Sequence, residues 1–143
     1  DPMAFNFPQP MLHSSDYDFS FSGLKTAVLY AVQDIGEINS QTQADIAASF
    51  QHAATEVLIK KITKALEDTG RESIVLAGGV AANKLLRNKI SLLKSKLNVD
   101  VLYPPLSHCT DNAAMIAYLG SMKVNEATFS LASHAKPRWP LGS

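Results

Sequence analysis

The longest regular pattern of hydrophobic positions lies in TQADIAASFQHAATEVLIKKITKALEDTG, residues 42–70. Apolar side chains recur there at intervals of three and four residues, the spacing of one face of an α-helix. These positions are Ile46, Phe50, Ala53, Ala54, Val57, Leu58, Ile62 and Leu66. The pattern predicts a long helix, and Gly70 is a natural stop because glycine readily adopts the left-handed conformation that ends helices.

After residue 70, short apolar runs alternate with helical segments. The runs are ESIVLAGG and VDVLYPP, and the helical segments that follow them are AANKLLRNKISLLKSKL and TDNAAMIAYLGSMKV. Two strands that are each followed by a helix are typical of parallel strands joined by a right-handed crossover. The pattern therefore predicts an α/β fold. Because a two-stranded sheet is marginal by itself, we expect the sheet to be incomplete and the chain to be part of something longer.

The flanking segments have weaker patterns. Residues 1–18 contain three prolines and are predicted to be irregular, since proline removes a backbone donor and disfavours helix at the preceding residue. In FSFSGLKTAVLYAVQDIG, residues 19–36, a short extended piece is expected to lead into a helix. The tail HAKPRWPLGS is expected to be irregular, with Trp139 packed against the body of a single domain, residues 1–143.

Composition narrows the class of protein. The chain has 143 residues, of which 46% are hydrophobic and 18% are charged, which is enough for one soluble domain with a core. Thirteen basic residues balance thirteen acidic ones, so attraction to nucleic acid would need local clustering of charge. A lone cysteine, Cys109, builds no disulfide framework, and no run is apolar enough to span a bilayer. We therefore expect a cytoplasmic protein that does not associate with a membrane.

The first candidate site is the junction IVLAGGVAANKLLR, residues 74–87. The carboxyl end of a parallel strand is where α/β folds bind ligands, and Gly78 and Gly79 would let a phosphate, ribose or purine approach the backbone closely. Asn83, read as lying about one turn into the following helix, would offer an amide to a sugar hydroxyl or phosphate. Two glycines alone, however, favour the alternative of a tight strand-to-helix turn with Asn83 as a solvated residue.

The second candidate is HCTDNAAMIAYLG, residues 108–120. The plainest role of Thr110 or Asp111 is to cap the helix that follows. Alternatively, Asp111 follows a strand and would coordinate a metal, although one carboxylate does not make a metal site. We interpret the adjacent His108 and Cys109 as packing residues.

A third candidate is DFSFSGLKT, in which Ser22 would cap a helix and Gly23 would permit an unusual turn. Lys25 in the first helical turn is unfavourable for the helix dipole, which hints at an anionic neighbour, although an exposed lysine is the plainer reading. Other basic residues form two groups that are most simply solvated helix faces and otherwise a phosphate-tracking patch. These are Lys60, Lys61 and Lys64, and Lys84, Arg87, Lys89, Lys94 and Lys96. His13, His52 and His134 lie in no catalytic motif.

Four motifs together are more specific than any one of them. In order they are DFSFSGLKTAV, IVLAGGVAANKLLR, CTDNAAMIAYLG and AKPRWPL, over residues 5–141. In this order the chain resembles the C-terminal part of the tRNA N6-adenosine threonylcarbamoyltransferase family, once described as O-sialoglycoprotein endopeptidase, in its bacterial or organellar branch. The resemblance implies a helix-rich part of the second lobe of an actin-like ATPase fold of the sugar kinase and Hsp70 type.

The resemblance also implies a function. Members transfer threonylcarbamoyl from threonylcarbamoyl-adenylate to N6 of adenosine 37 of tRNA, and they act with partner subunits. By this resemblance Asn83, with Gly78 and Gly79, contacts the nucleotide-like substrate. Asp111 is a ligand of one metal, iron or zinc, whose histidine ligands belong to a first lobe that this chain lacks. We therefore expect an enzyme whose isolated fragment is inactive.

Two alternatives remain at this stage. The chain would serve as an interaction or self-association module if an apolar face is left open. It would belong to a small-molecule kinase if the fold is shared but the chemistry is not, because fold does not determine function.

Overall fold

The computed structural model describes residues 1–127. The chain forms two compact units, one of residues 1–110 and one that begins at Asp111. The predicted tail after residue 127, with His134 and Trp139, lies outside the described residues. No helix in residues 1–127 combines the length and the apolarity needed to cross a bilayer.

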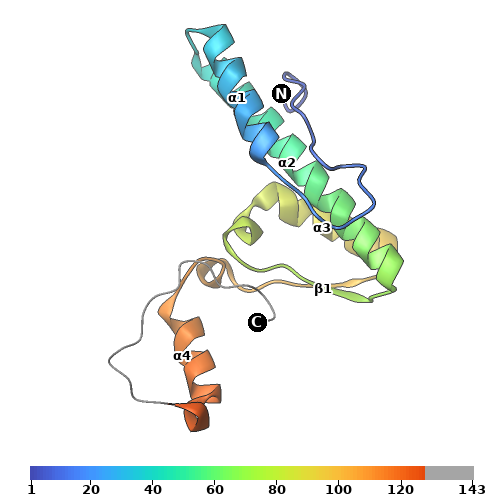
Figure 1. The fold of residues 1–143 in the computed structure, drawn as a ribbon, viewed down its shortest axis with the longest axis vertical. Helices are drawn as coiled ribbons and strands as arrows, with labels where there is room; N and C mark the ends of the chain where they lie inside the picture. The colour runs from blue at the N-terminus through green and yellow to red at the C-terminus, as the bar shows by residue number, and fades with distance from the viewer. Residues whose placement is uncertain (128–143) are drawn as a thin grey trace. The chain divides into compact units, whose positions relative to one another are not determined.

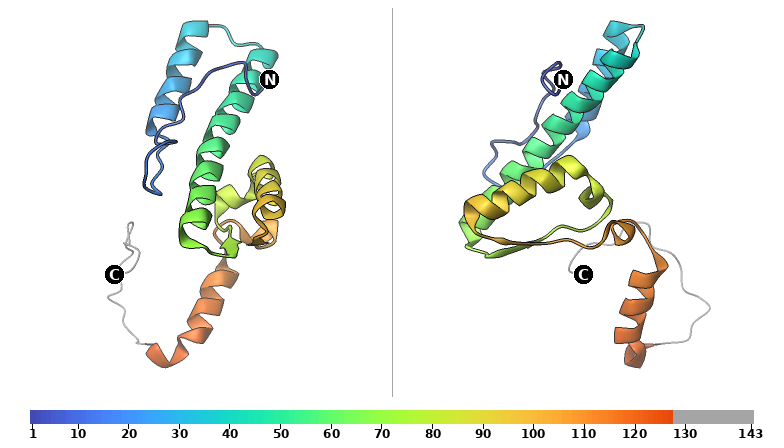
Figure 2. Two further views of the ribbon diagram at one scale, coloured as in Figure 1. Left: turned by 90° about the vertical axis from the view of Figure 1, so that its right-hand side faces the viewer. Right: turned by 180° about the vertical axis from the view of Figure 1, so that it is seen from behind.

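Two helices form an antiparallel hairpin in the first unit (Figures 1 and 2). Helix α1 spans Ser22–Ile35 and helix α2 spans Ser40–Thr69, which confirms both predicted helices. Asn39 caps α2 by accepting a hydrogen bond from the backbone N–H of Thr42. Gly70 ends α2 in the left-handed conformation, with φ 61°, as the pattern predicted.

The hairpin encloses the first part of the core. Leu24 of α1 is fully buried against Ile46 and Ala53 of α2, together with Phe7 of the N-terminal segment. That segment contains neither helix nor strand, as its prolines predicted. The backbone N–H of Phe5 donates to Ser49 Oγ at 3.1 Å, which fixes the segment along α2.

The sheet has two parallel strands in the described part of the chain. Strand β1 spans Ser73–Val75 and β2 spans Asp100–Leu102, with Ile74 opposite Val101. Helix α3, Lys84–Leu97, connects them and packs against α2 and β2 (Figure 2). Both strands are shorter than the apolar runs that predicted them, but the parallel strand–helix–strand order is confirmed.

One face of this sheet is covered and the other is open. Ile74 and Val101 are half-buried, on the same side as the α3 side chains Leu86 and Ile90, which are fully buried. On the other side, Val75 is 69% exposed, and its cross-strand neighbour Leu102 is 59% exposed. The described residues therefore form a helix-rich α/β unit whose sheet has an uncovered apolar face.

The second unit contains helix α4, Ala113–Met122, which confirms the last predicted helix. A short 3₁₀ turn, η3, follows at Val124–Glu126. None of the residues of α4 is buried, and its large apolar side chains, such as Ile116 and Tyr118, are mostly exposed.

Candidate functional site

The turn after β1 is built around a glycine conformation. Gly78 has φ 82° and ψ 176°, a region that residues with a Cβ essentially never occupy. It precedes a short 3₁₀ turn, η1, which spans Gly79–Ala82 and is closed by a hydrogen bond from Ala81 N to Gly78 O at 3.0 Å. Gly79 has no positive φ, and a Cβ built on it would meet no atom within 4 Å. The backbone conformation thus requires glycine at position 78, whereas the absence of a side chain at Gly79 leaves open space beside the turn.

Asn83 occupies a different position from the one expected. It is the N-cap of α3 and lies before the helix, not one turn into it, because its Oδ1 accepts a hydrogen bond from Leu86 N at 2.9 Å. Its Nδ2 donates to Gln51 Oε1 of α2 at 2.8 Å. The half-buried amide therefore joins two helices, and it retains one N–H and one lone pair for a ligand.

A groove of about 900 Å³ lies beside this turn, with walls from α1, α2 and η1. Its lining is largely apolar, and Lys25, Gln51 and Asn83 are its main polar groups. The full lining consists of Phe21, Lys25, Ala47, Ala48, Phe50, Gln51, Ala54, Thr55, Leu58, Gly79, Val80 and Asn83. Apolar walls with a small number of polar groups are typical of small-molecule sites.

The wall formed by α2 was missed at the level of sequence. Phe50, Ala54 and Leu58 belong to the apolar stripe that predicts the helix, and all three line the groove. Phe50 is 37% exposed, whereas Ala54 also packs against the core. Their spacing of four residues gave a signal, because it places them in one row along the helix. The spacing alone could not show which row of side chains faces a groove and which faces the core.

The third candidate segment also reaches the groove, with one correction. Ser22 is the first residue of α1 and not its cap, since Phe21 occupies the cap position without a side-chain hydrogen bond. Lys25 is exposed at the groove and has no ion-pair partner within residues 1–127, so the plainer reading of an exposed lysine is confirmed.

The segment around Asp111 differs from its predicted capping. Asn112 caps α4 by accepting from Met115 N at 3.0 Å, so neither Thr110 nor Asp111 is the cap. Asp111 is exposed at the start of the second unit. Among residues 1–127, no three His, Cys, Asp or Glu side chains are grouped in a way that would hold a metal ion. Cys109 is buried, as expected of a packing residue, but His108 is exposed.

Several basic residues predicted as solvated faces are engaged inside the molecule. Lys61 is buried, and its Nζ contacts Ser14 and Asp16. Lys89 Nζ donates to Thr55 Oγ1 and Glu56 Oε1, both at 2.7 Å. Arg87 makes only internal contacts in the described residues. The reading of these three side chains as a solvated face is therefore wrong, while Lys60, Lys84, Lys94 and Lys96 are exposed.

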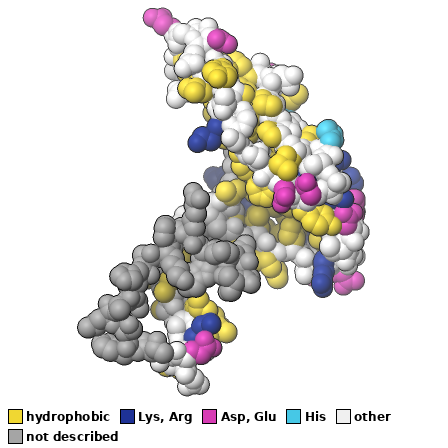
Figure 3. All heavy atoms as spheres, in the orientation of Figure 1, with side chains coloured by type: hydrophobic (Ala, Val, Ile, Leu, Met, Phe, Trp, Pro, Cys, Tyr) yellow, Lys and Arg dark blue, Asp and Glu magenta, His cyan; other side chains and the backbone are white. Residues whose placement is uncertain are grey.

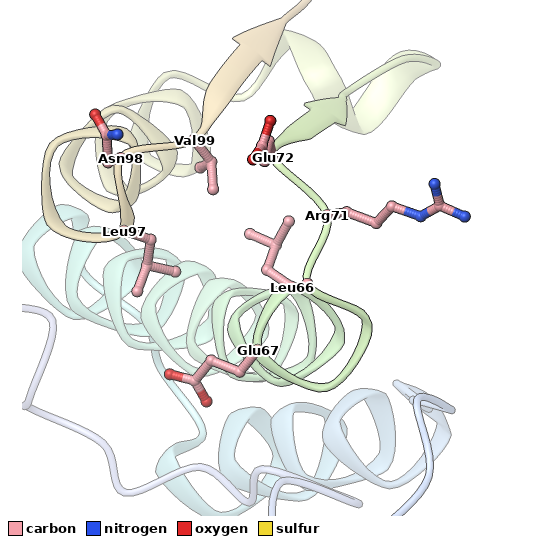
Figure 4. A pocket seen from close by; sticks show the side chains of 8 residues that line it. Leu66, Glu67, Arg71, Glu72, Leu97, Asn98 and Val99 are labelled. Carbon is pink, nitrogen blue, oxygen red and sulfur yellow. The ribbon is translucent and has the colours of Figure 1, made fainter.

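A second, smaller pocket lies at the opposite end of the sheet (Figure 4). It has a volume of about 410 Å³ and is formed where α2 ends before β1 and α3 ends before β2. Leu66, Leu97 and Val99 point into it, whereas Arg71 points away. None of the predicted site residues lines this pocket.

The structure thus defines an α/β protein with a largely apolar groove beside the turn that follows its first strand. Comparison with known proteins identifies the family. The model of the tRNA N6-adenosine threonylcarbamoyltransferase family matches residues 1–118, and the chain belongs to this family.

Individual relatives agree with this assignment. The protein named tRNA N6-adenosine threonylcarbamoyltransferase in Thermosipho africanus is 58% identical over 120 residues, which cover 84% of this chain and 36% of the relative. The protein of the same name in Chromobacterium violaceum is 47% identical over 99% of this chain and 43% of its own length. The one in Thermosipho melanesiensis is 50% identical over 94% of this chain and 40% of its own length. The chain therefore spans about two fifths of the length of these relatives.

Proposed function

We propose that the chain is the C-terminal part of an enzyme that transfers threonylcarbamoyl from threonylcarbamoyl-adenylate to N6 of adenosine 37 of tRNA. The family membership supports the reaction. The observation that connects it to particular residues is the groove beside Gly79 and Asn83, whose lining is largely apolar and has Lys25, Gln51 and Asn83 as its main polar groups.

Each part of the groove has a role in this proposal. The apolar walls formed by Phe50 and Leu58 suit the faces of a purine. The missing side chain of Gly79 lets the ribose or phosphate approach the backbone, and the remaining N–H of Asn83 donates to one of their oxygens. Lys25 supplies a positive charge for the phosphate.

The proposal includes a metal, but the described residues do not complete a site for it. Asp111 offers one carboxylate, and metals in proteins generally need three or more protein ligands. We therefore assign no chemical step to the iron or zinc ion. Asp111 is proposed as one of its ligands, with the others contributed by the additional length found in the relatives.

The remaining parts of the proposal concern the whole protein. The complete enzyme would have an actin-like ATPase fold, of which this chain is a helix-rich part of the second lobe. It would act in the cytoplasm on tRNA together with partner subunits. The 143-residue chain alone would be inactive, since it spans about two fifths of the length of its relatives.

The substitution Asn83→Asp in the full-length enzyme tests the binding role. Aspartate keeps the helix cap, because its carboxylate also accepts from Leu86 N, but it replaces the N–H donor with a negative charge. We expect the affinity for adenosine monophosphate to fall by about tenfold or more, which corresponds to about 1.4 kcal/mol or more. Titration calorimetry measures this change.

The matched control is Asn88→Asp, which makes the same change of charge at an exposed position of α3. It should bind the nucleotide as the unmodified enzyme does. Equal affinities in all three proteins would rule out Asn83 as a nucleotide contact.

A further inference from the structure

One side chain connects the loops that follow the two strands. The Arg87 Nε donates to Ala81 O of η1 at 2.5 Å. Its Nη2 donates to Pro104 O at 3.3 Å and to Cys109 Sγ at 3.2 Å, both in the segment after β2. Its guanidinium carbon lies 4.5 Å from the ring centroid of Tyr103. A single planar group is therefore held by both loops at once.

The first of these loops carries candidate site residues, and the second precedes one in the sequence. The first contains Gly78 and Gly79 and leads to Asn83, which lines the groove. The second, Tyr103–Cys109, leads along the chain to Asp111. Both follow the carboxyl ends of parallel strands, the edge at which α/β sheets bind ligands.

We propose that Arg87 is a positioning residue, which holds the η1 turn and the Tyr103–Cys109 segment in the fixed arrangement that transfer of threonylcarbamoyl from the bound adenylate requires. This inference rests on the proposed function. Arginine suits the task because its fork of donors reaches several acceptors in one plane while its face stacks on an aromatic ring. Lysine keeps the charge but donates from a single point, so it cannot reproduce these contacts.

The buried thiol gives a direct measure of this arrangement. Cys109 is 1% exposed, and it is the single cysteine in the chain, so labelling with a maleimide reports on it alone. Without the Arg87 contacts, the Tyr103–Cys109 segment should open more often. In Arg87→Lys and Arg87→Gln, we expect the 143-residue chain to be labelled about tenfold faster or more. Asn88→Ala, at an exposed position of the same helix, should be labelled at the unmodified rate.

The functional measurement uses the full-length enzyme with threonylcarbamoyl-adenylate and tRNA. A misaligned segment should lower kcat by about a hundredfold in Arg87→Lys. The affinity for adenosine monophosphate should change by less than about threefold, because every residue that lines the groove is retained and η1 keeps its own hydrogen bond from Ala81 N to Gly78 O. Circular dichroism confirms that each variant is folded. Tyr103→Leu, which removes only the stacked ring, provides a milder variant and should show smaller changes in the same direction.

Three outcomes would overturn the proposal. Labelling at the unmodified rate in both Arg87 variants would show that Arg87 does not hold the second segment. Faster labelling with an unchanged kcat would restrict Arg87 to stability. Equal losses of kcat and of nucleotide affinity would make it a binding residue. A full-length enzyme that neither binds the nucleotide nor modifies tRNA would refute the proposed function, and the thiol result would still decide whether Arg87 holds the two loops.

Discussion

At the scale of single residues, Lys61 is a charged group held almost entirely by the protein. Its side chain is 5% exposed, and its Nζ lies 2.7 Å from Ser14 Oγ, 2.8 Å from Asp16 O and 3.2 Å from both Ser14 O and Asp16 Oδ1. These oxygens belong to the N-terminal segment, which leads into Phe21 at the groove. Lys61 therefore anchors that segment to α2.

We predict that Lys61→Met lowers the free energy of unfolding by about 1.5–3 kcal/mol, the range for hydrogen bonds to charged groups. The expected loss is smaller than for a fully buried ion pair, because half of the Asp16 side chain is exposed and can regain contact with water. Urea unfolding measures the loss. Lys60→Met, at the exposed neighbouring position, should change stability by less than about 0.5 kcal/mol. Equal losses in both variants would contradict an anchoring role.

The same contacts predict a dependence on pH. The Ser14 hydroxyl, and then Lys61, hold the pKa of Asp16 below its ordinary value. Because the folded pKa is the lower one, this contribution is present above the unfolded pKa, about 3.9, and is lost as the pH falls through the folded value. Unfolding measured between about pH 5 and pH 3 should therefore show a weaker loss of stability in Lys61→Met than in the unmodified chain. Parallel profiles would contradict the coupling.

Asp111 provides a prediction for the metal. In the full-length enzyme, Asp111→Asn keeps the size of the side chain but removes its charge, so we expect metal content and tRNA modification both to fall. Metal analysis of the purified protein is the measurement, and Asp100→Asn is the control, because Asp100 is an exposed carboxylate at the first residue of β2. Metal content equal to that of the unmodified enzyme would remove Asp111 from the ligand set.

The sequence could identify these residues but not their surroundings. Lys61 finds its partners 45 and 47 residues away, and Arg87 finds Cys109 at a distance of 22 residues. Such contacts depend on tertiary packing, so a run of lysines predicts a solvated face whether or not a partner exists. Asn83 and Asn112 are different, since asparagine before an apolar helical run is a strong capping signal that local reasoning could have used.

Among the structural elements, the turn before α3 contains two neighbouring glycines with different roles. Gly78→Ala should lower the free energy of unfolding by about 1–3 kcal/mol, because its φ and ψ belong to a region that alanine avoids. Gly79→Ala should change it by less than about 0.5 kcal/mol, since the added Cβ meets open space. That same methyl projects beside the groove and should weaken nucleotide binding in the full-length enzyme. Thermal unfolding and titration calorimetry measure the two effects, and equal destabilisation by both substitutions would contradict this division.

The elements themselves could largely be predicted from the sequence. The helices followed from spacing over many turns, and Gly70 ended α2 where expected. The strands were found but overextended, because only three residues of each have partners in the described sheet. The groove could not be predicted, because residues of α1, α2 and η1 line it together and no local sequence pattern shows how these elements pack.

At the scale of the whole molecule, apolar side chains remain at the surface. Figure 3 shows hydrophobic groups spread along the α1–α2 hairpin, and the open face of the sheet adds Val75 and Leu102. Exposed apolar patches of this kind mark surfaces that associate or are covered by further structure. They fit a chain that spans about two fifths of its relatives' length.

The division into two units gives the last prediction. Residues 1–110 include the hairpin, the sheet, α3 and all the contacts of Arg87 that involve the described residues, whereas no residue of α4 is buried. A chain that ends at Thr110 should therefore keep its free energy of unfolding to within about 0.5 kcal/mol of the 143-residue chain. A chain that ends at Leu102 loses Tyr103, Pro104 and Cys109, and with them three of the four described contacts of the Arg87 guanidinium. It should therefore be less stable by about 1–3 kcal/mol. Urea unfolding of the three chains separates these cases. Equal stability of the two shorter chains would mean that the segment after β2, with its contacts to Arg87, contributes nothing to the stability of the first unit.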